Sequence, residues 1–310
     1  MSQGIYRRVK VAVINTSLER PYHSYGDHWR DGFTDAGCIV TVYPYDMIPQ
    51  ISQGFDLYFF VEIRYNHYII PRNLHPRVLY SWDSHVAPVE MYEDALLTFD
   101  KIFLASKIDV EFFHKKNIKE FVWIPEACNP RIHKNLHRDR IYKLGFVGNN
   151  NDYYFRNGKS KDEFIAYFKR EPFNMLCKQG IYGDDYTEVL NKIWIMFDRT
   201  IQHNIGTRIF ESAASGCIPL WSDASYNTGI NELLVNGKHY LSYNDTIGDA
   251  ERVIKSLFNE PEKANKIAED AESHVLANHT YANRALMILD ALNIDYIKSE
   301  NTEKMTVSFT

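Results

Sequence analysis

The sequence predicts an α/β protein of two domains, each built around a parallel sheet. Its 310 residues exceed what one hydrophobic core usually holds and are comfortable for two. Largely apolar runs such as 9–14 and 55–61 have the length and composition of strands that are buried on both faces. Stretches with helical spacing separate these runs, and this alternation of strand and helix is typical of a parallel sheet.

The first domain is predicted to span residues 1–130. After its first strand, helical spacing through Trp29 and Phe33 ends at Gly37. Further strands are predicted at residues 39–43, 55–61, 77–80, 101–105 and 121–124, with a helix at 109–116. Pro125 ends the last strand, because proline cannot donate to a strand ladder.

Residues 131–143, with the sequence RIHKNLHRDRIYK, form a predicted basic linker. A charge run of this kind is usually solvated. His133 and His137 lie at helical spacing, but no Glu stands between them as in zinc hydrolases, so we interpret them as linker residues. A second domain is predicted at 144–280, followed by a helix at 281–298 and a loose polar tail at 299–310.

Composition argues against several classes of protein. No stretch approaches the roughly 18 uninterrupted apolar residues of a membrane helix, and the apolar run near the N-terminus is too short for a signal peptide. We therefore expect a cytoplasmic protein. The formal net charge of −5 argues against a protein that coats nucleic acid. The four cysteines are far apart in the sequence and predict neither a disulfide framework nor a zinc site.

The most specific stretch is HNIGTRIFESAASGCIPLWSD, at residues 203–223. Asn204 and Gly206 indicate a flexible turn, and the nine residues that follow contain no helix breaker. Gly216 stands where a helix needs a left-handed residue at its C-terminal end. The apolar run 217–221 then predicts a buried parallel strand.

The predicted helix in this stretch has one apolar and one polar face. Its polar face carries Arg208, Glu211, Ser212 and Ser215, which recur at three- and four-residue spacing. The pattern predicts that the side chains of this face are free to make polar contacts. On that interpretation, Glu211→Ala changes the free energy of unfolding by no more than about 0.5 kcal/mol, as at a surface position.

The same stretch resembles the donor-binding signature of retaining glycosyltransferases of the GT-B fold, in the group-1 (family-4-like) class, and most closely that of CgeB-type spore-maturation glycosyltransferases. Glu211 matches the second Glu of a signature in which seven residues separate two Glu, and Gly216 and Pro219 follow in register. His203 replaces the first Glu. The resemblance is strong from 144 to 289 and thin in the first domain. It implies two Rossmann-like domains that face a cleft, with the C-terminal helix crossing back to the N-terminal domain.

The resemblance also implies which residues bind the donor. A strand leading into Gly148 and a basic loop resembles the family's phosphate loop, in which backbone N–H groups and a cation such as Lys161 face the diphosphate. Arg208 is expected at the phosphates and Glu211 at the ribose, because a carboxylate offers two acceptor oxygens to two hydroxyls. The expected donor-binding residues are His203, Gly206, Thr207, Arg208, Glu211, Gly148, Asn149, Lys161, Tyr182 and Gly183.

The candidate catalytic residues are His85, Asp83 and Arg208. The family commonly places a His from the first domain against the donor sugar, and His85 follows a predicted strand in the segment Ser-Trp-Asp-Ser-His. Asp83 is a candidate general base or acceptor-orienting group. No Asp-x-Asp metal motif precedes a donor loop, and the adjacent pair Asp184-Asp185 is interpreted as a turn. No metal ion or cofactor is therefore expected besides the nucleotide-sugar co-substrate, taken to be a UDP-sugar.

The function predicted from these features is that of a hexosyltransferase, which moves a sugar from a nucleotide-diphosphate donor to an acceptor hydroxyl with retention. Two alternatives remain: a sugar-nucleotide epimerase of the same fold, and a non-catalytic sugar-nucleotide-binding protein, which the replacement of the first Glu favours. The acceptor stays open between a surface glycan, a protein, a small metabolite and a modified DNA base, because acceptor contacts come from variable loops. The donor sugar and the oligomeric state also stay open.

Overall fold

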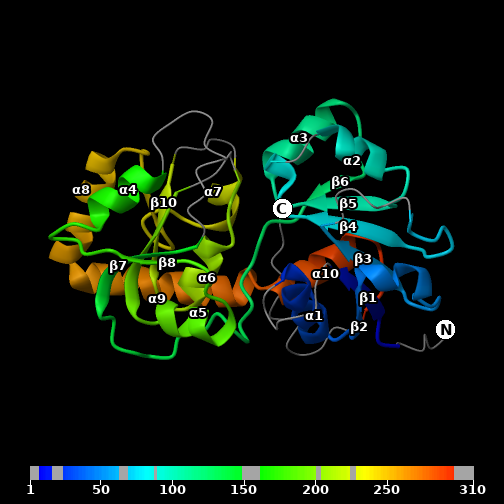
Figure 1. Cartoon of the computed structure of the whole chain (residues 1–310), viewed down its shortest axis with the longest axis horizontal. Helices are drawn as coiled ribbons and strands as arrows, with labels where there is room; N and C mark the ends of the chain where they lie inside the picture. The colour runs from blue at the N-terminus through cyan, green and yellow to red at the C-terminus, as the bar shows by residue number, and fades with distance from the viewer. Residues whose placement is uncertain are drawn as a thin grey trace, which may run out of the picture. The chain divides into compact units, whose positions relative to one another are not determined.

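The computed structural model describes residues 7–15, 24–62, 69–86, 89–148, 161–199, 204–223 and 228–296. The chain divides into two compact units (Figure 1), one of Met1–Pro125 with Thr280–Thr310 and the other of Glu126–His279. Each unit holds one sheet whose strands all pair in parallel, with helices packed against it. The predicted class, two α/β domains with parallel sheets, is confirmed.

The first unit has, within the described residues, a six-stranded sheet in the order β2-β1-β3-β4-β5-β6. Its strands are β1 (Lys10–Asn15), β2 (Ile39–Pro44), β3 (Leu57–Val61), β4 (Arg77–Ser81), β5 (Lys101–Leu104) and β6 (Phe121–Trp123). Its helices are α1 (Tyr25–Asp35), α2 (Val89–Ala95), α3 (Lys107–Lys115) and α10 (Tyr281–Ala291), with short 3-10 turns η1 (Tyr45–Gln50) and η3 (Ser84–Val86). Every residue of β3 and β4 is buried, as expected for strands covered on both faces.

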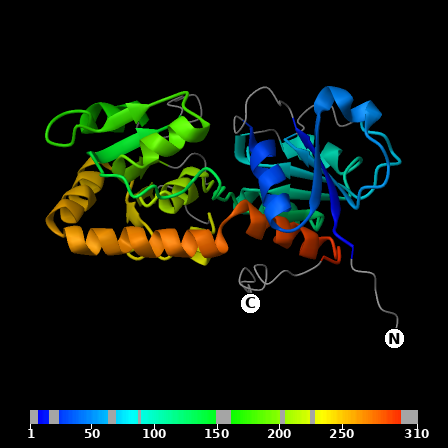
Figure 2. The ribbon, with the colours of Figure 1, turned by 90° about the horizontal axis from the view of Figure 1, so that it is seen from below.

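Helix α10 packs against α1 (Figure 2), so the end of the described chain belongs to the first unit. The ring of His28 stacks on that of Tyr281 with centroids 5.2 Å apart. Gly32 allows the close approach, because a Cβ at this position would lie 2.6 Å from the carbonyl oxygen of Tyr281. Arg284, which is 0% exposed, donates to the carbonyl of Pro125 at 2.9 Å.

The second unit has, in the part of it that the structure describes, a five-stranded sheet in the order β11-β10-β9-β7-β8. Its strands are β7 (Tyr142–Val147), β8 (Leu176–Lys178), β9 (Ile193–Asp198), β10 (Ile218–Ser222) and β11 (Leu241–Tyr243). Its helices are α4 (Lys161–Phe168), α5 (Gly183–Leu190), α6 (Arg208–Ala214), α7 (Ile230–Leu233), α8 (Ile247–Asn259) and α9 (Pro261–Asn278). Fully buried side chains such as Phe164, Phe197 and Leu220 form its core.

Several residues of the segment 131–143 are bound to the second unit, whereas most of its charged side chains, such as Arg138 and Lys143, are exposed as expected for a solvated segment. Arg140 donates to the carbonyl oxygens of Leu190 and Ser215, at 3.0 and 2.7 Å, and thereby caps the C-terminal ends of α5 and α6. Asn191, which is 0% exposed, donates to the carbonyl of Lys134 at 2.9 Å. The charge of Arg140 therefore serves helix capping rather than solvation.

None of the helices in the described ranges is long and apolar enough to cross a membrane.

Candidate functional site

Both predicted faces of helix α6 are largely buried. Ser212 and Ser215, predicted on a free polar face, are 0% exposed because the helix packs against α9 and β10. Of the four side chains on the polar face, only those of Arg208 and Glu211 are partly exposed, to 20% and 13% respectively. Gly216 follows at φ +73°, which confirms the predicted left-handed C-terminal residue. The prediction of a free polar face is wrong, and only two side chains of that face reach the solvent.

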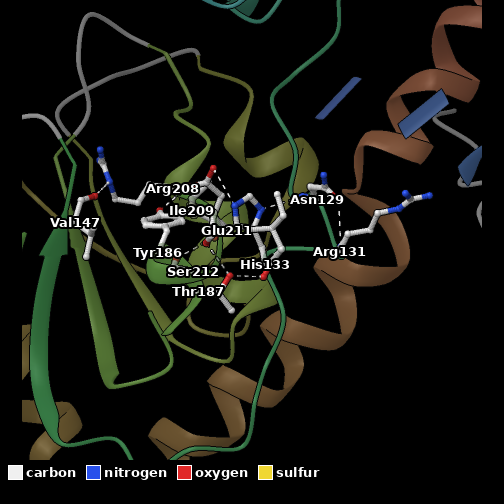
Figure 3. Close-up of polar contacts among 12 residues, drawn as sticks. Asn129, Arg131, His133, Val147, Tyr186, Thr187, Arg208, Ile209, Glu211 and Ser212 are labelled. Atoms are coloured by element: carbon white, nitrogen blue, oxygen red, sulfur yellow. Dashed lines mark hydrogen bonds and ion pairs between the residues drawn. The ribbon is translucent and has the colours of Figure 1, made fainter. Parts of the chain in front are cut away.

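Arg208 lies across the carboxyl ends of β7 and β9. Its Nε donates to the carbonyl of Val147 at 2.8 Å (Figure 3), and its Nη1 pairs with the carboxylate of Asp198. The guanidinium also lies over the ring of Phe146, 5.0 Å from its centroid. Burial opposes the charge, but the surrounding anionic groups, chiefly Asp198, raise the pKa of Arg208 above its ordinary value. Arg208 is therefore a fixed cation. Asp198, its main partner, was missed in the sequence.

Gly148 and Lys161 complete the described part of the predicted phosphate loop. Gly148 has φ +147°, and a Cβ at this position would collide with the guanidinium of Arg208, so only glycine fits. Lys161 is 2% exposed and its Nζ lies 5.2 Å from the centroid of the Phe146 ring. Two cations thus lie against one aromatic ring at the end of β7. The predicted donor residues Asn149 and His203 lie outside the described residues.

The carboxylate of Glu211 lies between side chains of two other segments (Figure 3). The hydroxyl of Tyr186, on α5, donates to its Oε2 at 2.6 Å. On the other side, Nε2 of His133 lies 3.6 Å from its Oε1. His133 is 2% exposed, so this residue of the predicted linker is buried. Burial lowers the pKa of His133 to about 3, so its ring is neutral at physiological pH.

The other predicted donor residues of this unit stand at the starts of α5 and α6. Gly206 and Thr207 lead into α6, and Tyr182 and Gly183 lead into α5. Tyr182 is 47% exposed, and Gly183 has φ +57°. The hydrogen bond between Tyr186 and Glu211 connects the two helices one turn further on. The two pairs of predicted donor residues therefore stand at the starts of the two helices that are joined at Glu211.

The pair Asp184-Asp185 forms the first turn of α5, so its interpretation as a turn is wrong. Carboxylates are favourable there because the N-terminal end of a helix carries partial positive charge. Within the described ranges, no group of three or more His, Cys, Asp or Glu side chains is arranged to hold a metal ion.

Asp83 and His85 belong to the first unit, in the segment that follows β4. Its start is held by Glu62, a buried carboxylate with φ +56° at the end of β3. The two oxygens of Glu62 accept hydrogen bonds from Oγ of Ser81 at 3.0 Å and from the backbone N–H of Trp82 at 2.9 Å. A carboxylate that was not predicted from the sequence thus fixes the segment that carries the candidate catalytic residues.

The sequence from 131 to 290 matches the protein family described as "Glycosyl transferase-like", over more than half of the chain. The chain belongs to this glycosyltransferase family. A search among curated proteins gave no match to this glycosyltransferase.

Solved structures of other glycosyltransferases resemble this enzyme in fold. HepE of Anabaena, solved with UDP-glucose, has a TM-score of 0.64 at 11% identity, covering 92% of this chain and 100% of that one. An α-glucosyltransferase, solved with UDP and a 13-mer DNA containing an HMU base, has a TM-score of 0.62 at 12% identity, covering 93% and 99%. AviGT4, a glycosyltransferase involved in avilamycin A biosynthesis, has a TM-score of 0.57 at 13% identity, covering 92% and 97%. These likenesses confirm the predicted GT-B fold of the two α/β units.

Two buried histidines are predicted to make this glycosyltransferase less stable as the pH falls. Burial lowers the pKa of His133 to about 3, and burial followed by the nearby His274 lowers that of His239 to about 4. Both stay neutral in the folded protein at pH 5, whereas in the unfolded chain they protonate near 6.5. The unfolded state then binds more protons, so His133 lowers the free energy of unfolding by about 2 kcal/mol between pH 6.5 and 5, and His239 acts in the same direction.

Urea unfolding at several pH values measures this loss. His239→Gln removes one titrating group. The slope of the free energy of unfolding against pH should therefore fall by the amount that corresponds to about one proton. Equal slopes in the wild type and the variant would contradict the pKa direction assigned to His239.

Proposed function

We propose that the protein transfers a hexose from a UDP-sugar to an acceptor hydroxyl, with retention and without a metal ion. The observation that carries the proposal is the arrangement of Arg208, Lys161 and Glu211 at the carboxyl ends of the second sheet. Two cations against the Phe146 ring, beside Gly148, suit a diphosphate. The carboxylate of Glu211 suits the two adjacent hydroxyls of a ribose. The solved complexes of structural neighbours with UDP and UDP-glucose support UDP as the nucleotide of the donor, with uracil as its base.

In the proposed reaction, the bond between the anomeric carbon and the diphosphate oxygen breaks while the acceptor oxygen bonds to the anomeric carbon on the same face, and the proton of the acceptor hydroxyl passes to the leaving diphosphate. Negative charge grows on the leaving diphosphate, and Arg208 and Lys161 stabilise it because they are held in place before the reaction. From the family resemblance, we assign His85 a role toward the donor sugar and Asp83 a role in orienting the acceptor hydroxyl. To His203, in place of the first Glu of the signature, we assign the recognition of the donor sugar.

A screen of nucleotide sugars by thermal shift, followed by mass spectrometry of the products, tests the proposal. A UDP-sugar at a hundred times its Kd should stabilise the fold by about 2.7 kcal/mol, and ADP- and GDP-sugars should stabilise it less. Release of UDP with transfer or hydrolysis of the sugar supports the proposal. A changed sugar epimer would identify an epimerase, and binding without turnover across a panel of acceptors would identify a binding protein; both outcomes contradict it.

Turnover is predicted to survive chelation of divalent ions. Arg208 and Lys161 supply the positive charge that Mg²⁺ or Mn²⁺ supplies at the diphosphate in metal-dependent enzymes. Initial rates of UDP release are compared in EDTA, in EDTA followed by excess Mn²⁺, and without additive. Equal rates are expected, whereas a loss of turnover in EDTA that Mn²⁺ restores would refute metal independence.

A further inference from the structure

We propose that His133 and Tyr186 are positioning residues, which hold the Glu211 carboxylate ready for the ribose hydroxyls of the donor. The inference rests on the proposed function, because it takes the ligand of Glu211 to be a ribonucleotide. It assigns a part in donor recognition to a segment that precedes the second sheet. Neither residue touches the reacting atoms, and both act through Glu211.

Tyr186 fixes one oxygen of the carboxylate. Its hydroxyl donates to Oε2 of Glu211 at 2.6 Å, a short hydrogen bond to a charged acceptor. Burial first, and then the negative charge of Glu211, raise the phenolic pKa well above its ordinary value. The hydroxyl therefore keeps its proton and remains a donor at neutral pH.

His133 faces the other oxygen with a defined tautomer. Its Nδ1 accepts a hydrogen bond from the backbone N–H of Asn129 at 3.0 Å. A neutral imidazole carries one ring proton, so this proton lies on Nε2, which is directed at Oε1 of Glu211 from 3.6 Å. This distance is longer than a hydrogen bond, and the N–H attracts the carboxylate as a dipole. The ring also meets that of Tyr186 edge-on, with centroids 5.8 Å apart and planes at 87°.

The turn that carries His133 is itself anchored to α5. Oδ1 of Asn129 accepts from the backbone N–H of Arg131 at 3.1 Å, and its carbonyl accepts from the N–H of His133 at 2.7 Å. Oγ1 of Thr187, the residue next to Tyr186, donates to the carbonyl of Ile132 at 2.7 Å (Figure 3). The two positioning side chains therefore belong to one rigid frame, which contacts both oxygens of Glu211.

Neutral donors are suited to this role. They orient the carboxylate without cancelling its charge, so Glu211 remains a strong acceptor for ligand hydroxyls. A carboxylate that is held in one orientation binds two hydroxyls at fixed spacing, such as the 2′ and 3′ hydroxyls of a ribose, without losing rotational freedom on binding. Loss of the frame should therefore reduce affinity for UDP more than affinity for 2′-deoxy-UDP.

The test measures the Kd of UDP and of 2′-deoxy-UDP for the full chain by isothermal titration. Tyr186→Phe removes the hydroxyl and should raise the Kd of UDP about tenfold, the value for one hydrogen bond to a charged group. The Kd of 2′-deoxy-UDP should rise about threefold or less. His133→Leu should act in the same direction, and His133→Gln should retain affinity because its amide N–H replaces Nε2–H. Tyr142→Phe is the matched control, because Tyr142 packs against the same apolar cluster as Tyr186.

A positioning role also predicts coupling to Glu211. In a Glu211→Ala background, Tyr186→Phe should change the Kd of UDP less than twofold, because the carboxylate it orients is gone. If the role were purely structural, Tyr186→Phe would weaken the binding of both nucleotides equally, and the same loss would be measured in the Glu211→Ala background. This result would overturn the inference. If His133→Leu does not fold, Tyr186→Phe and His133→Gln still decide the question.

The failure of this inference is distinguishable from that of the proposed function. If the wild type binds UDP and Glu211→Ala weakens it, but Tyr186→Phe binds like the wild type, only the positioning role is refuted. If the wild type binds neither UDP nor UDP-glucose, the proposed function and the inference are refuted together.

Discussion

Replacing Arg208 by Met is expected to lower the free energy of unfolding by about 3 kcal/mol, the usual consequence of removing one partner of a buried ion pair. Met keeps much of the volume but leaves the carboxylate of Asp198, in a residue that is 6% exposed, without its main countercharge. The carbonyl of Val147 also loses a donor at 2.8 Å, and the ring of Phe146 loses a cation. The loss should be large because these contacts converge on one side chain.

Urea unfolding of the variant measures this effect. Arg252→Met is the matched control, because Arg252 pairs with Asp249 on the surface and its side chain is 71% exposed; there we expect a change of about 0.5 kcal/mol or less. A double-mutant cycle with Asp198→Asn should give a coupling energy above about 1 kcal/mol. If Arg208→Met is no more destabilising than Arg252→Met, the buried pair does not stabilise the fold.

Replacing Glu211 by Ala is expected to weaken UDP binding by about a hundredfold, since two hydrogen bonds that the ribose hydroxyls donate to a charged acceptor are lost. The structure also revises the expected effect on stability. Because the hydroxyl of Tyr186 loses its acceptor in a half-buried place, the variant should lose about 1 kcal/mol of stability rather than the surface-like change predicted from the sequence.

Isothermal titration of UDP against the folded variant measures this loss of affinity. Glu188→Ala is a suitable control, since Glu188 lies on α5, is 42% exposed and pairs with Arg138. The control should bind UDP like the wild type. Unchanged affinity in Glu211→Ala would remove Glu211 from the donor site.

The pattern of apolar runs was sufficient to predict the sheets and the central helix. Strands predicted at 55–61 and 217–221 correspond to β3 and β10, and every residue of these two strands is buried, as expected for apolar runs that are covered on both faces of a parallel sheet. The polar face of α6 was predicted wrongly, because helical periodicity describes one helix by itself. It carries no information about which other elements pack on the polar face. Ser212 and Ser215 are small enough to be covered by α9 and β10, and their burial follows from tertiary packing.

The basic segment 131–143 shows a second limit of sequence reasoning. Its charges suggested solvation, yet Arg140 and His133 find their partners at Ser215 and Glu211, more than seventy positions later. Such pairing depends on how the chain folds back and leaves no local signal. The family resemblance located Glu211, whereas its contacts with Tyr186 and His133 became visible only in three dimensions.

A crystal structure of the chain with UDP would test the central claim most directly. We predict that the ribose hydroxyls lie about 2.7–3.2 Å from the carboxylate oxygens of Glu211, within hydrogen-bond distance. The diphosphate should lie beside Gly148, next to the guanidinium of Arg208. A UDP molecule bound elsewhere, with the carboxylate of Glu211 bonded only to protein groups, would contradict the account.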